Sequence, residues 1–314
     1  MTIDIDRVPW STHSDTLRDI RKAVFIDEQG VAQDLEWDEH DESDSTIHLL
    51  AHDDERPIGC ARVLLSGSDP GKITRLAVRK ENRRQGVGAT LLQTASDLVF
   101  ETADDAYLHA QLASLPFYQK YGFVAEGDVF VEAGIDHLEM HLRRDCAESL
   151  IKLYRTRVLR LDSADHFSRH LDQVVRCGRR KIDILSTVLE REIYGRDSVV
   201  EALSKFLRDD PHATLRILVE DSSLLPKLRH PLVDLARRLS SKADIRRIVA
   251  GSDPIENAFA IVDEKSLLFF NDEAHFLGFV NYDDAPTARR FAEKFQHLWD
   301  HYSEQDPNLI EFII

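Results

Sequence analysis

The stretch from Ile73 to Leu92 most constrains the fold of this chain, because it reads as a strand, a basic turn and the start of a helix. Two glycines in the turn, Gly86 and Gly88, let backbone N–H groups approach a ligand closely. A helix beginning there adds about half a positive charge at the same point. Four cations precede the glycines: Arg79, Lys80, Arg83 and Arg84. The segment therefore predicts an anion-binding turn suited to a pyrophosphate.

The spacing of this turn excludes two familiar phosphate-binding motifs. Leu91 stands where the dinucleotide fingerprint needs its third glycine, and no Gly-Lys-Ser/Thr follows as in a Walker loop. From the spacing alone, a tight turn that only starts a helix remains an alternative. The chain as a whole is acidic, with a formal charge of -16. A general nucleic-acid coat protein is therefore excluded, and the basic turn reverses the local sign of the charge.

Composition indicates a folded, two-domain protein. The 314 residues are 43% hydrophobic and 31% charged, which suits about two soluble domains. No apolar run approaches the ~20 residues of a membrane span. The acidic N-terminus has no apolar core of a signal peptide. The three cysteines stand singly, without a CxxC pair. We therefore expect a cytoplasmic protein with no membrane partner and no metal.

The pattern of strands and helices places the domain boundary near residue 145. Residues 1–145 form the first expected domain, in which Thr12 to Phe25 has apolar residues at helical spacing. Residues 150–314 form the second. Its alternating strand and helix patterns, ending in a long helix from Ala285 to His301, predict an α/β sheet with helical crossovers.

The surroundings of the basic turn resemble a known enzyme family. The pattern Arg83-x-x-Gly86-x-Gly88 resembles the acetyl-CoA pyrophosphate loop of the GNAT (Gcn5-related) N-acetyltransferases, and Phe117-Tyr118 followed by Gly122-Phe123 resembles a second family element. Three further stretches resemble a bacterial subgroup of this family, the ElaA-like and YjcF-like proteins: Val24–Val31, Leu108–Gln111 and Phe130–His137. The resemblance covers residues 1–144. It implies the α+β GNAT fold with a mixed, central antiparallel and parallel sheet, and transfer of an acetyl group from acetyl-CoA to a primary amine.

The resemblance also implies roles for individual residues. Tyr118 would be the general acid for the leaving thiolate, with Tyr121 as the competing phenol. The backbone of Leu76, Ala77 and Val78 would bind the pantetheine and polarise the acetyl carbonyl. The complete implied set of cofactor-binding residues is Leu76, Ala77, Val78, Arg83, Arg84, Gln85, Gly86, Val87, Gly88, Ala89, Phe117 and Tyr121.

The general base and the acceptor site stay open at this point. Glu28 and His109 are catalytic candidates beside Tyr118, and a relay through ordered water is an alternative to any side chain. The acceptor-binding candidates are Glu28, Gln29, Gln111, Glu132 and His137. Of these, Glu28, Glu132 and His137 also compete for the role of base. The run from Asp27 to Asp44 holds nine acidic residues and no lysine or arginine. It is either a solvated loop or an acidic rim that attracts a cationic amine.

The second half resembles one lobe of the phospholipase-D-like fold. If Asp263 is the aspartate of the H-x-K-x4-D motif, Glu256 and Ala258 stand at the histidine and lysine positions, so the catalytic groups are missing. Such a domain would serve binding or assembly, including a homodimer. This half also contains two basic clusters, one of Arg176, Arg179, Arg180 and Lys181 and the other of Arg237, Arg238, Lys242, Arg246 and Arg247. They are either solvated helix ends or a patch that binds phosphate or nucleic acid. A non-catalytic acyl-CoA sensor and a nucleic-acid adaptor are the competing functions.

Overall fold

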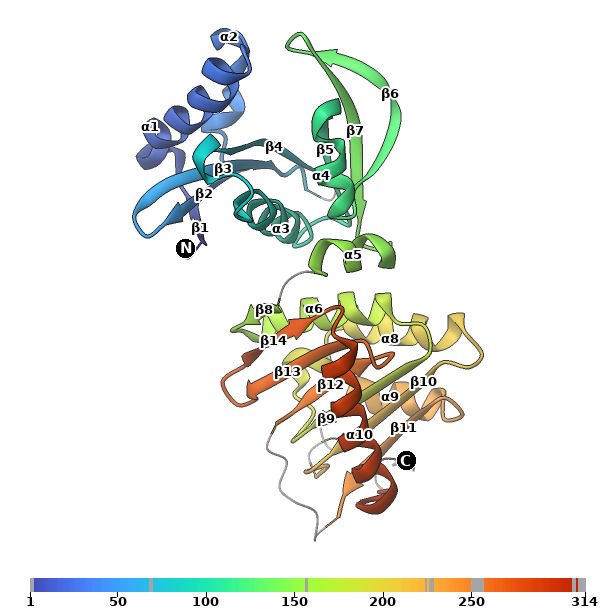
Figure 1. The fold of residues 1–314 in the computed structure, drawn as a ribbon. Coiled ribbons are helices and arrows are strands. Elements are labelled where there is room, and N and C mark those ends of the chain that lie inside the picture. The colour runs from blue at the N-terminus through green and yellow to red at the C-terminus, as the bar shows by residue number, and fades with distance from the viewer. Residues whose placement is uncertain are drawn as a thin grey trace. The chain divides into compact units, whose positions relative to one another are not determined.

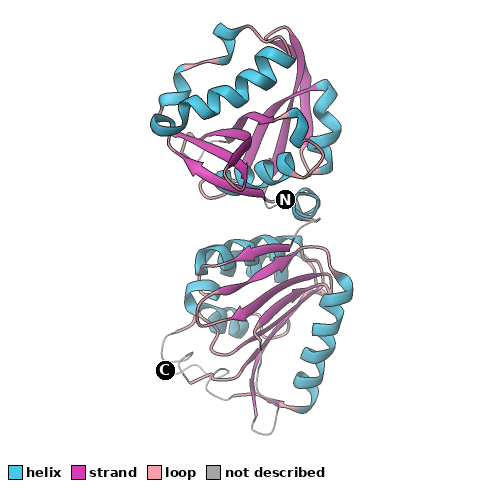
Figure 2. Cartoon of the chain, turned by 60° about the vertical axis from the view of Figure 1, so that its left-hand side comes forward, coloured by secondary structure: helices cyan, strands magenta, loops and turns pink. Residues whose placement is uncertain are grey.

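The computed structural model describes residues 3–67, 70–155, 158–223, 225, 229–249, 257–306 and 309. Contacts divide the chain into two units, Met1–Leu153 and Tyr154–Ile314, coloured blue to green and green to red in Figure 1. Each unit has its own sheet flanked by helices (Figure 2). In the described part of the chain, no helix has the length and apolarity needed to cross a bilayer.

The first unit is built on a seven-stranded sheet with the order β1-β2-β3-β4-β5-β7-β6. Its strands are β1 Ile3–Val8, β2 Thr46–Asp53, β3 Arg56–Leu64, β4 Gly71–Val78, β5 Asp105–Gln111, β6 Val124–Glu132 and β7 Ile135–Arg143. The neighbours β4 and β5 run parallel, and the other neighbours run antiparallel. The sheet is therefore mixed, as expected.

Two helices cover opposite faces of this sheet. The helical segments of the unit are α1 Trp10–Arg21, η1 Lys22–Glu28, α2 Gln33–Glu36, η2 Glu39–Glu42, η3 Lys80–Asn82, α3 Val87–Val99, η4 Leu112–Ser114, α4 Leu115–Lys120 and α5 Ala147–Tyr154. α1 buries Leu17 and Ile20 against Cys60 and Ala77. α3 packs on the other face, where Leu91 approaches Gly59. Burial raises the pKa of the Cys60 thiol to about 12, which suits the predicted core role.

The segment expected to be helical, from Thr12 to Phe25, is helical, but its geometry changes after Arg21. The α-helix begins at Trp10 and ends at Arg21, and a π-helical segment continues to Glu28. The wider turn keeps Val24 buried in the core, at 4% exposure. Apolar spacing alone cannot distinguish such a turn from a regular helix, because both place Val24 inward.

The two central strands of the first unit separate from each other. The register of β4 with β5 contains two pairs, Gly71 with Ala106 and Lys72 with Tyr107. Farther along, Arg75 and Leu76 of β4 oppose a single residue of β3 in a bulge. Arg75 adopts a positive φ of 52° there, a strained conformation for a residue with a side chain. After Lys72, the register of β4 with β5 contains no further pair among the described residues.

The second unit contains an eight-stranded sheet of order β15-β11-β10-β9-β12-β13-β14-β8. Its strands are β8 Val158–Leu161, β9 Lys181–Ser186, β10 Thr214–Val219, β11 Ala243–Ile248, β12 Phe259–Val262, β13 Ser266–Asp272, β14 Leu277–Asn281 and β15 Ser303–Glu304. Its helices are α6 Ala164–Cys177, α7 Arg191–Tyr194, α8 Asp197–Asp209, α9 Pro231–Arg238 and α10 Ala285–His301. The parallel strands β9, β10 and β11 are linked through helices, as the alternating pattern predicted.

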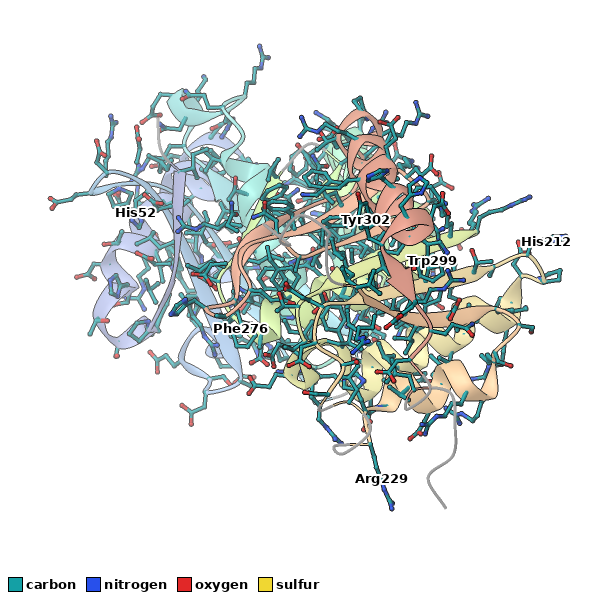
Figure 3. The ribbon with its side chains drawn as sticks, turned by 90° about the horizontal axis from the view of Figure 1, so that it is seen from below. His52, His212, Arg229, Phe276, Trp299 and Tyr302 are labelled. Carbon is teal, nitrogen blue, oxygen red and sulfur yellow. The ribbon has the colours of Figure 1, made fainter. Side chains whose placement is uncertain are left out.

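The final helix lies alone on one face of the second sheet, and α6, α8 and α9 lie on the other (Figure 2). α10 occupies the residues that the sequence predicted, and the Asp284 side chain caps its first turn by accepting from Thr287 N at 3.2 Å. Its Phe295 and Trp299 pack on the sheet. Trp299 and Tyr302 mark the end of this helix in Figure 3.

Asp263 has a structural role in the second unit. It lies in the turn between β12 and β13, and its carboxylate accepts N–H bonds from Arg179, Arg180 and Lys181 at 2.7–2.9 Å. Ala258 is buried just before β12. Glu256, the other motif position, lies outside the described residues.

Candidate functional site

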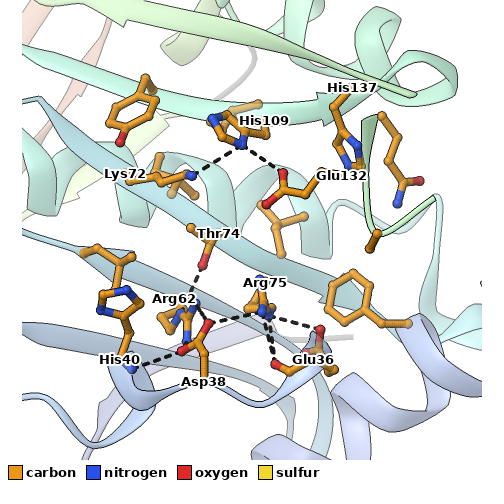
Figure 4. A pocket seen from close by; sticks show the side chains of 18 of the residues that line it. Glu36, Asp38, His40, Arg62, Lys72, Thr74, Arg75, His109, Glu132 and His137 are labelled. Carbon is orange, nitrogen blue, oxygen red and sulfur yellow. Dashed lines mark hydrogen bonds and ion pairs between the residues drawn. The ribbon is translucent and has the colours of Figure 1, made fainter. Parts of the chain in front are cut away.

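A polar cavity of about 790 Å³ lies over the separated strands of the first unit. Its floor includes Thr74 and Leu76 of β4 and Leu108 of β5. One wall comes from the segment after α1, and the opposite wall comes from β5, β6 and β7 (Figure 4). The floor of the cavity therefore includes the part of β4 beyond its last described pair with β5.

Tyr118 lies at this cavity together with Gln111 and Ser114. The ring of Tyr118 packs edge-on against Phe117 at 5.0 Å and Phe123 at 6.0 Å between centroids. Burial raises the pKa of the Tyr118 phenol to about 12. The hydroxyl therefore keeps its proton at neutral pH and can donate it. The competing phenol, Tyr121, is not part of the cavity lining.

The predicted anion-binding turn adopts the conformation that leaves N–H groups available. Gly86 is the N-cap of α3 with a φ of +92°, and it lies exposed. Gly86 O accepts from Thr90 N at 3.0 Å. The N–H groups of Val87, Gly88 and Ala89 precede the first intrahelical bond and therefore lack an acceptor within the helix. This geometry suits an anion at the helix N-terminus.

Some residues around this turn can offer a side chain to a ligand, and others can offer only their backbone. Arg84 is exposed, and Gln85 donates its amide N–H to Glu81 O at 3.0 Å. The side chains of Val87 and Ala77 are buried at 1% exposure, so these two predicted cofactor residues offer only their backbone. A Cβ on Gly88 would lie 3.5 Å from the Phe117 ring. The glycine turn and the Phe117-Tyr118 element, which both resemble GNAT motifs, are therefore neighbours in space.

Glu28 is separated from the other predicted acceptor residues. Its carboxylate accepts two N–H bonds from Arg83, both at 2.7 Å, and it does not line the cavity. The Arg83 hydrogen bonds lower the pKa of Glu28. The same ion pair engages Arg83, which also donates to Val78 O at 3.0 Å. As a base for an amine in the cavity, Glu28 is therefore misplaced in this structure.

Three of the nine acidic residues between Asp27 and Asp44 are paired with three arginines beside the cavity. Arg21 contacts Glu36 at 2.6 Å and Asp41 at 2.7 Å. Arg62 contacts Asp38 at 2.6 Å and Asp41 at 2.7 Å, and Arg75 contacts Glu36 at 3.1 Å and Asp38 at 3.2 Å. We call these six residues the charge network, of which Glu36, Asp38, Arg62 and Arg75 are labelled in the lower part of Figure 4.

The charge network corrects the interpretation of this run only at Glu36, Asp38 and Asp41, because Asp34, Glu39, Glu42 and Asp44 are exposed, as in a solvated loop. Glu36 and Asp41 are buried at 3% exposure, so these parts of the run are not a solvated loop. Three carboxylates facing three guanidinium groups carry no net charge, so they do not form an acidic rim. Burial is costly for such groups unless each charge is paired, as it is here.

Asp38 of the network makes stability depend on acid pH. Burial raises its pKa, but the hydrogen bond and charge of Arg62 outweigh that effect and lower the pKa to about 2. The unfolded value is about 3.9, so the contribution of Asp38 is complete above pH 5 and is lost as the pH falls toward 2. We expect a loss on the order of 2 kcal/mol over that range. Urea unfolding at pH 5 and pH 2 measures it, and Asp38→Asn should unfold with a shallower dependence on pH than the wild-type chain.

The opposite wall carries histidines and carboxylates. His109 Nδ1 lies 2.8 Å from Glu132 Oε2, and its Nε2 lies 3.4 Å from Glu139 Oε2. Lys72 Nζ lies 3.3 Å from the same Nδ1. Burial lowers the pKa of Lys72. For Glu132 burial raises the pKa, but hydrogen bonding and charge from His109 outweigh it and the pKa is lowered.

The remaining acceptor candidates meet at the other end of this wall. Gln111 Nε2 donates to Gln29 Oε1 at 2.9 Å, across the cavity mouth from β5 to the end of η1. His137 lies on β7 with its Nδ1 2.8 Å from Ile135 O. The structure thus brings together five predicted residues from distant segments, namely Gln29, His109, Gln111, Glu132 and His137.

The sequence missed several residues of the cavity. Lys72, Tyr107 and the arginines of the charge network line or support it, yet none belongs to a local motif. Their proximity follows from strand register, since Arg62 lies opposite Thr74 and donates to its hydroxyl at 3.0 Å. Within the described residues, no group of three or more His, Cys, Asp or Glu is arranged to hold a metal.

The basic clusters of the second unit are mostly paired with acidic or carbonyl groups. Arg176 contacts Asp172 at 3.0 Å, and Arg246 contacts Asp244 at 2.9 Å. Lys242 Nζ donates to the carbonyls of Leu207 and Asp210. Because these side chains are already paired within the fold, we interpret them as stabilising helix and strand ends and not as an open phosphate-binding patch.

Comparison with known proteins separates the two units in the same way. Residues 14–144 match the acetyltransferase (GNAT) domain family, and residues 163–312 match DUF7931, a domain of unknown function. Escherichia coli ElaA is 33% identical over 129 residues, which are 40% of this chain and 83% of that protein. YjcF of Bacillus subtilis, described as an uncharacterized N-acetyltransferase, is 32% identical over 38% of this chain and 86% of its own. The crystal structure of ElaA aligns with 45% of this chain and 99% of that chain at 27% identity and a TM-score of 0.40.

Proposed function

Because this chain belongs to the GNAT family of acetyltransferases through its residues 14–144, we propose that it transfers the acetyl group of acetyl-CoA to a primary amine held in the cavity of the first unit. The observation that carries this proposal is that the turn lies next to the elements that line the cavity. A Cβ on Gly88 would lie 3.5 Å from Phe117 and 3.7 Å from Val78, and Leu76 and Tyr118 of the same two elements line the polar cavity.

The backbone of the first unit would bind and polarise the donor. The N–H groups at the start of α3 and the Arg84 guanidinium suit the diphosphate of the coenzyme. The β4 backbone of Leu76, Ala77 and Val78, which is unpaired toward β5, suits the pantetheine amides. Backbone donors aimed at the acetyl carbonyl would stabilise the oxyanion that forms when an amine attacks.

Tyr118 would assist departure of the thiolate. Attack by the neutral amine gives a tetrahedral intermediate, and its collapse breaks the C–S bond. The Tyr118 hydroxyl passes its proton to the sulfur and recovers one from the nitrogen that becomes the amide. With its pKa raised to about 12, Tyr118 completes this exchange as a relay and does not become a stable phenolate.

The lining of the cavity favours a small polar amine as acceptor. Lys72, His109 and Glu132 face the cavity with the Gln29–Gln111 pair at its mouth. Glu132 keeps a carboxylate at neutral pH because its pKa is lowered. A carboxylate at this position would attract the ammonium form of the acceptor.

For the second unit we propose a binding or assembly role. It is an α/β unit. We propose that residues 150–314 form a phospholipase-D-like lobe that lacks catalytic groups and can form a homodimer. We propose residues 1–145 as the acetyltransferase domain. The carboxylate of Asp263 accepts three backbone N–H bonds, which supports a structural role at that position. Analytical ultracentrifugation of the full chain tests the dimer.

The proposed activity is tested with purified full-length protein. Calorimetry should show binding of acetyl-CoA, and thiol release should follow addition of one or more of benzylamine, putrescine, spermidine and free lysine. Saturation with acetyl-CoA at about 100 times its Kd should stabilise the protein by about 2.7 kcal/mol. Binding of acetyl-CoA without transfer to any amine would favour the acyl-CoA sensor, and absence of binding would reject both.

Arg84→Glu should weaken acetyl-CoA binding with little effect on folding. Arg84 is exposed beside the N–H groups of α3, so its charge is available to the diphosphate. A charge-assisted hydrogen bond contributes about 1.5–3 kcal/mol, so Kd should rise by about 10- to 100-fold in calorimetry. Lys205→Glu, which reverses an exposed charge on α8 of the second unit, is the control and should leave Kd unchanged. Equal affinity in both variants would show that Arg84 does not contact the coenzyme.

A further inference from the structure

We propose that His137 is the base that takes the proton from the acceptor ammonium, an inference that rests on the acetyl transfer proposed above. His137 is 9% exposed and lies on β7 at the edge of the cavity. Figure 4 shows it at the end of the wall that also carries Glu132 and His109. The argument depends on which ring nitrogen carries a lone pair.

The hydrogen bond of His137 fixes its tautomer. Nδ1 lies 2.8 Å from the carbonyl oxygen of Ile135. A carbonyl oxygen can only accept, so Nδ1 must carry the proton. In the neutral ring, Nε2 then holds a lone pair, and no hydrogen bond from the described residues uses it. The backbone of β7 therefore prepares Nε2 to accept a proton.

The other candidate bases lack this property. Both nitrogens of His109 already have polar partners, Nδ1 with Glu132 at 2.8 Å and Nε2 with Glu139 at 3.4 Å. The Glu132 carboxylate is hydrogen-bonded to His109, which contributes to its lowered pKa. A carboxylate with a lowered pKa is a weak base. Glu28 is held by Arg83 outside the cavity. His137 is the remaining candidate.

The surroundings of His137 also suit the imidazolium that would form. The charges of Glu132 and His137 interact, and the protonated ring lowers the pKa of that carboxyl. Phe130 stacks on the His137 ring with centroids 6.0 Å apart and planes at 25°. A histidine oriented by a backbone bond on one side, with a carboxylate nearby to stabilise its charge, follows the logic of a catalytic dyad.

The protons of the reaction balance with this assignment. The acceptor enters as R–NH3+ and gives one proton to Nε2 of His137, which leaves a lone pair for attack on the thioester carbon. The nitrogen loses its second proton through Tyr118 to the departing sulfur. The products are the acetamide and the CoA thiol, and His137 returns its proton to solvent.

The tautomer can be measured without knowing the acceptor. In full-length protein labelled with 15N-histidine, the His137 signals are those that disappear in His137→Asn. At pH 7.5 we expect a protonated Nδ1 and an unprotonated Nε2. A protonated Nε2 with an unprotonated Nδ1 would overturn the proposal, because no lone pair would then face the cavity.

The kinetic test uses the best amine of the panel above. His137→Asn keeps a donor near Ile135 O but removes the base, so kcat/KM at pH 7.5 should fall by about 10²–10⁴-fold. The ascending limb of the wild-type pH profile should move toward the pKa of the amine in this variant. The Kd of acetyl-CoA should stay the same, which excludes a general loss of structure.

His141→Asn is the matched control for this test. His141 lies on the same strand, pairs with Asp105 and Glu139, and does not line the cavity. It should retain the wild-type ascending limb. An unchanged limb and rate in His137→Asn would reject His137 as the base while leaving the acetyltransferase proposal intact. A wild-type chain that acetylates no amine would reject the proposed function itself.

Discussion

Replacement of Tyr118 by phenylalanine should lower kcat about 10²–10⁴-fold and leave the Kd of acetyl-CoA nearly unchanged. The ring would keep its edge-on contacts with Phe117 and Phe123, so only the hydroxyl is removed. Without that hydroxyl, the thiolate must leave unprotonated and the amide nitrogen must lose its proton to water. Stopped-flow measurement of thiol release, together with calorimetry of acetyl-CoA binding, separates the two parameters.

Tyr121→Phe is the control for this experiment. Tyr121 lies one helical turn away, stacks near Phe117 at 5.2 Å and does not line the cavity. It should change kcat by less than about threefold, well below the effect of losing an acid–base group. Equal activities of the two variants would show that Tyr118 only packs. A larger loss in Tyr121→Phe would make Tyr121 the acid.

Asp41→Asn should destabilise the first unit by about 3–5 kcal/mol. Asp41 is 3% exposed and accepts from both Arg21 and Arg62 at 2.7 Å. The amide has nearly the same shape but leaves two buried guanidinium charges without their shared counter-charge. At about 2–4 °C per kcal/mol for a unit of this size, its thermal transition should fall by about 6–20 °C.

Scanning calorimetry of the full chain checks this prediction. Acetyl-CoA identifies the transition of the first unit, because a bound ligand raises it. The control is Asp27→Asn, which breaks an exposed pair with Lys22 whose side chains are 54% and 56% exposed. That change should cost less than about 1 kcal/mol. If the two variants unfold at the same temperature, the charge network does not stabilise the unit.

Features that depend on neighbouring residues followed from the sequence. The final helix from Ala285 to His301 was predicted with its bounds, because its apolar spacing and its start are local properties. The glycine turn also followed, because a positive φ at Gly86 and the free N–H groups after it require only one turn of chain. The π-helical segment after Arg21 did not, because two helical geometries place the same residue inward.

The candidate site was predicted as a set of residues but not as an arrangement. Glu28 and His137 were equal candidates in the sequence. Only the fold shows that one is held by Arg83, 55 residues away, and the other by a carbonyl on its own strand. Hydrogen-bond partners decide the proton affinity of such groups, and distant partners have no sequence signal in a single chain.

The sequence by itself predicted the coenzyme class of this protein, through the Gly86 turn and the Tyr118 element, because each is a motif of a few neighbouring residues. The tertiary structure alone decided the chemistry of the acceptor cavity. Three carboxylates of the acidic run, Glu36, Asp38 and Asp41, are paired with arginines that reach them from α1, β3 and the bulge in β4, namely Arg21, Arg62 and Arg75. Charge in a folded protein depends on which groups strand register brings within ~4 Å, and that register is a property of the whole sheet.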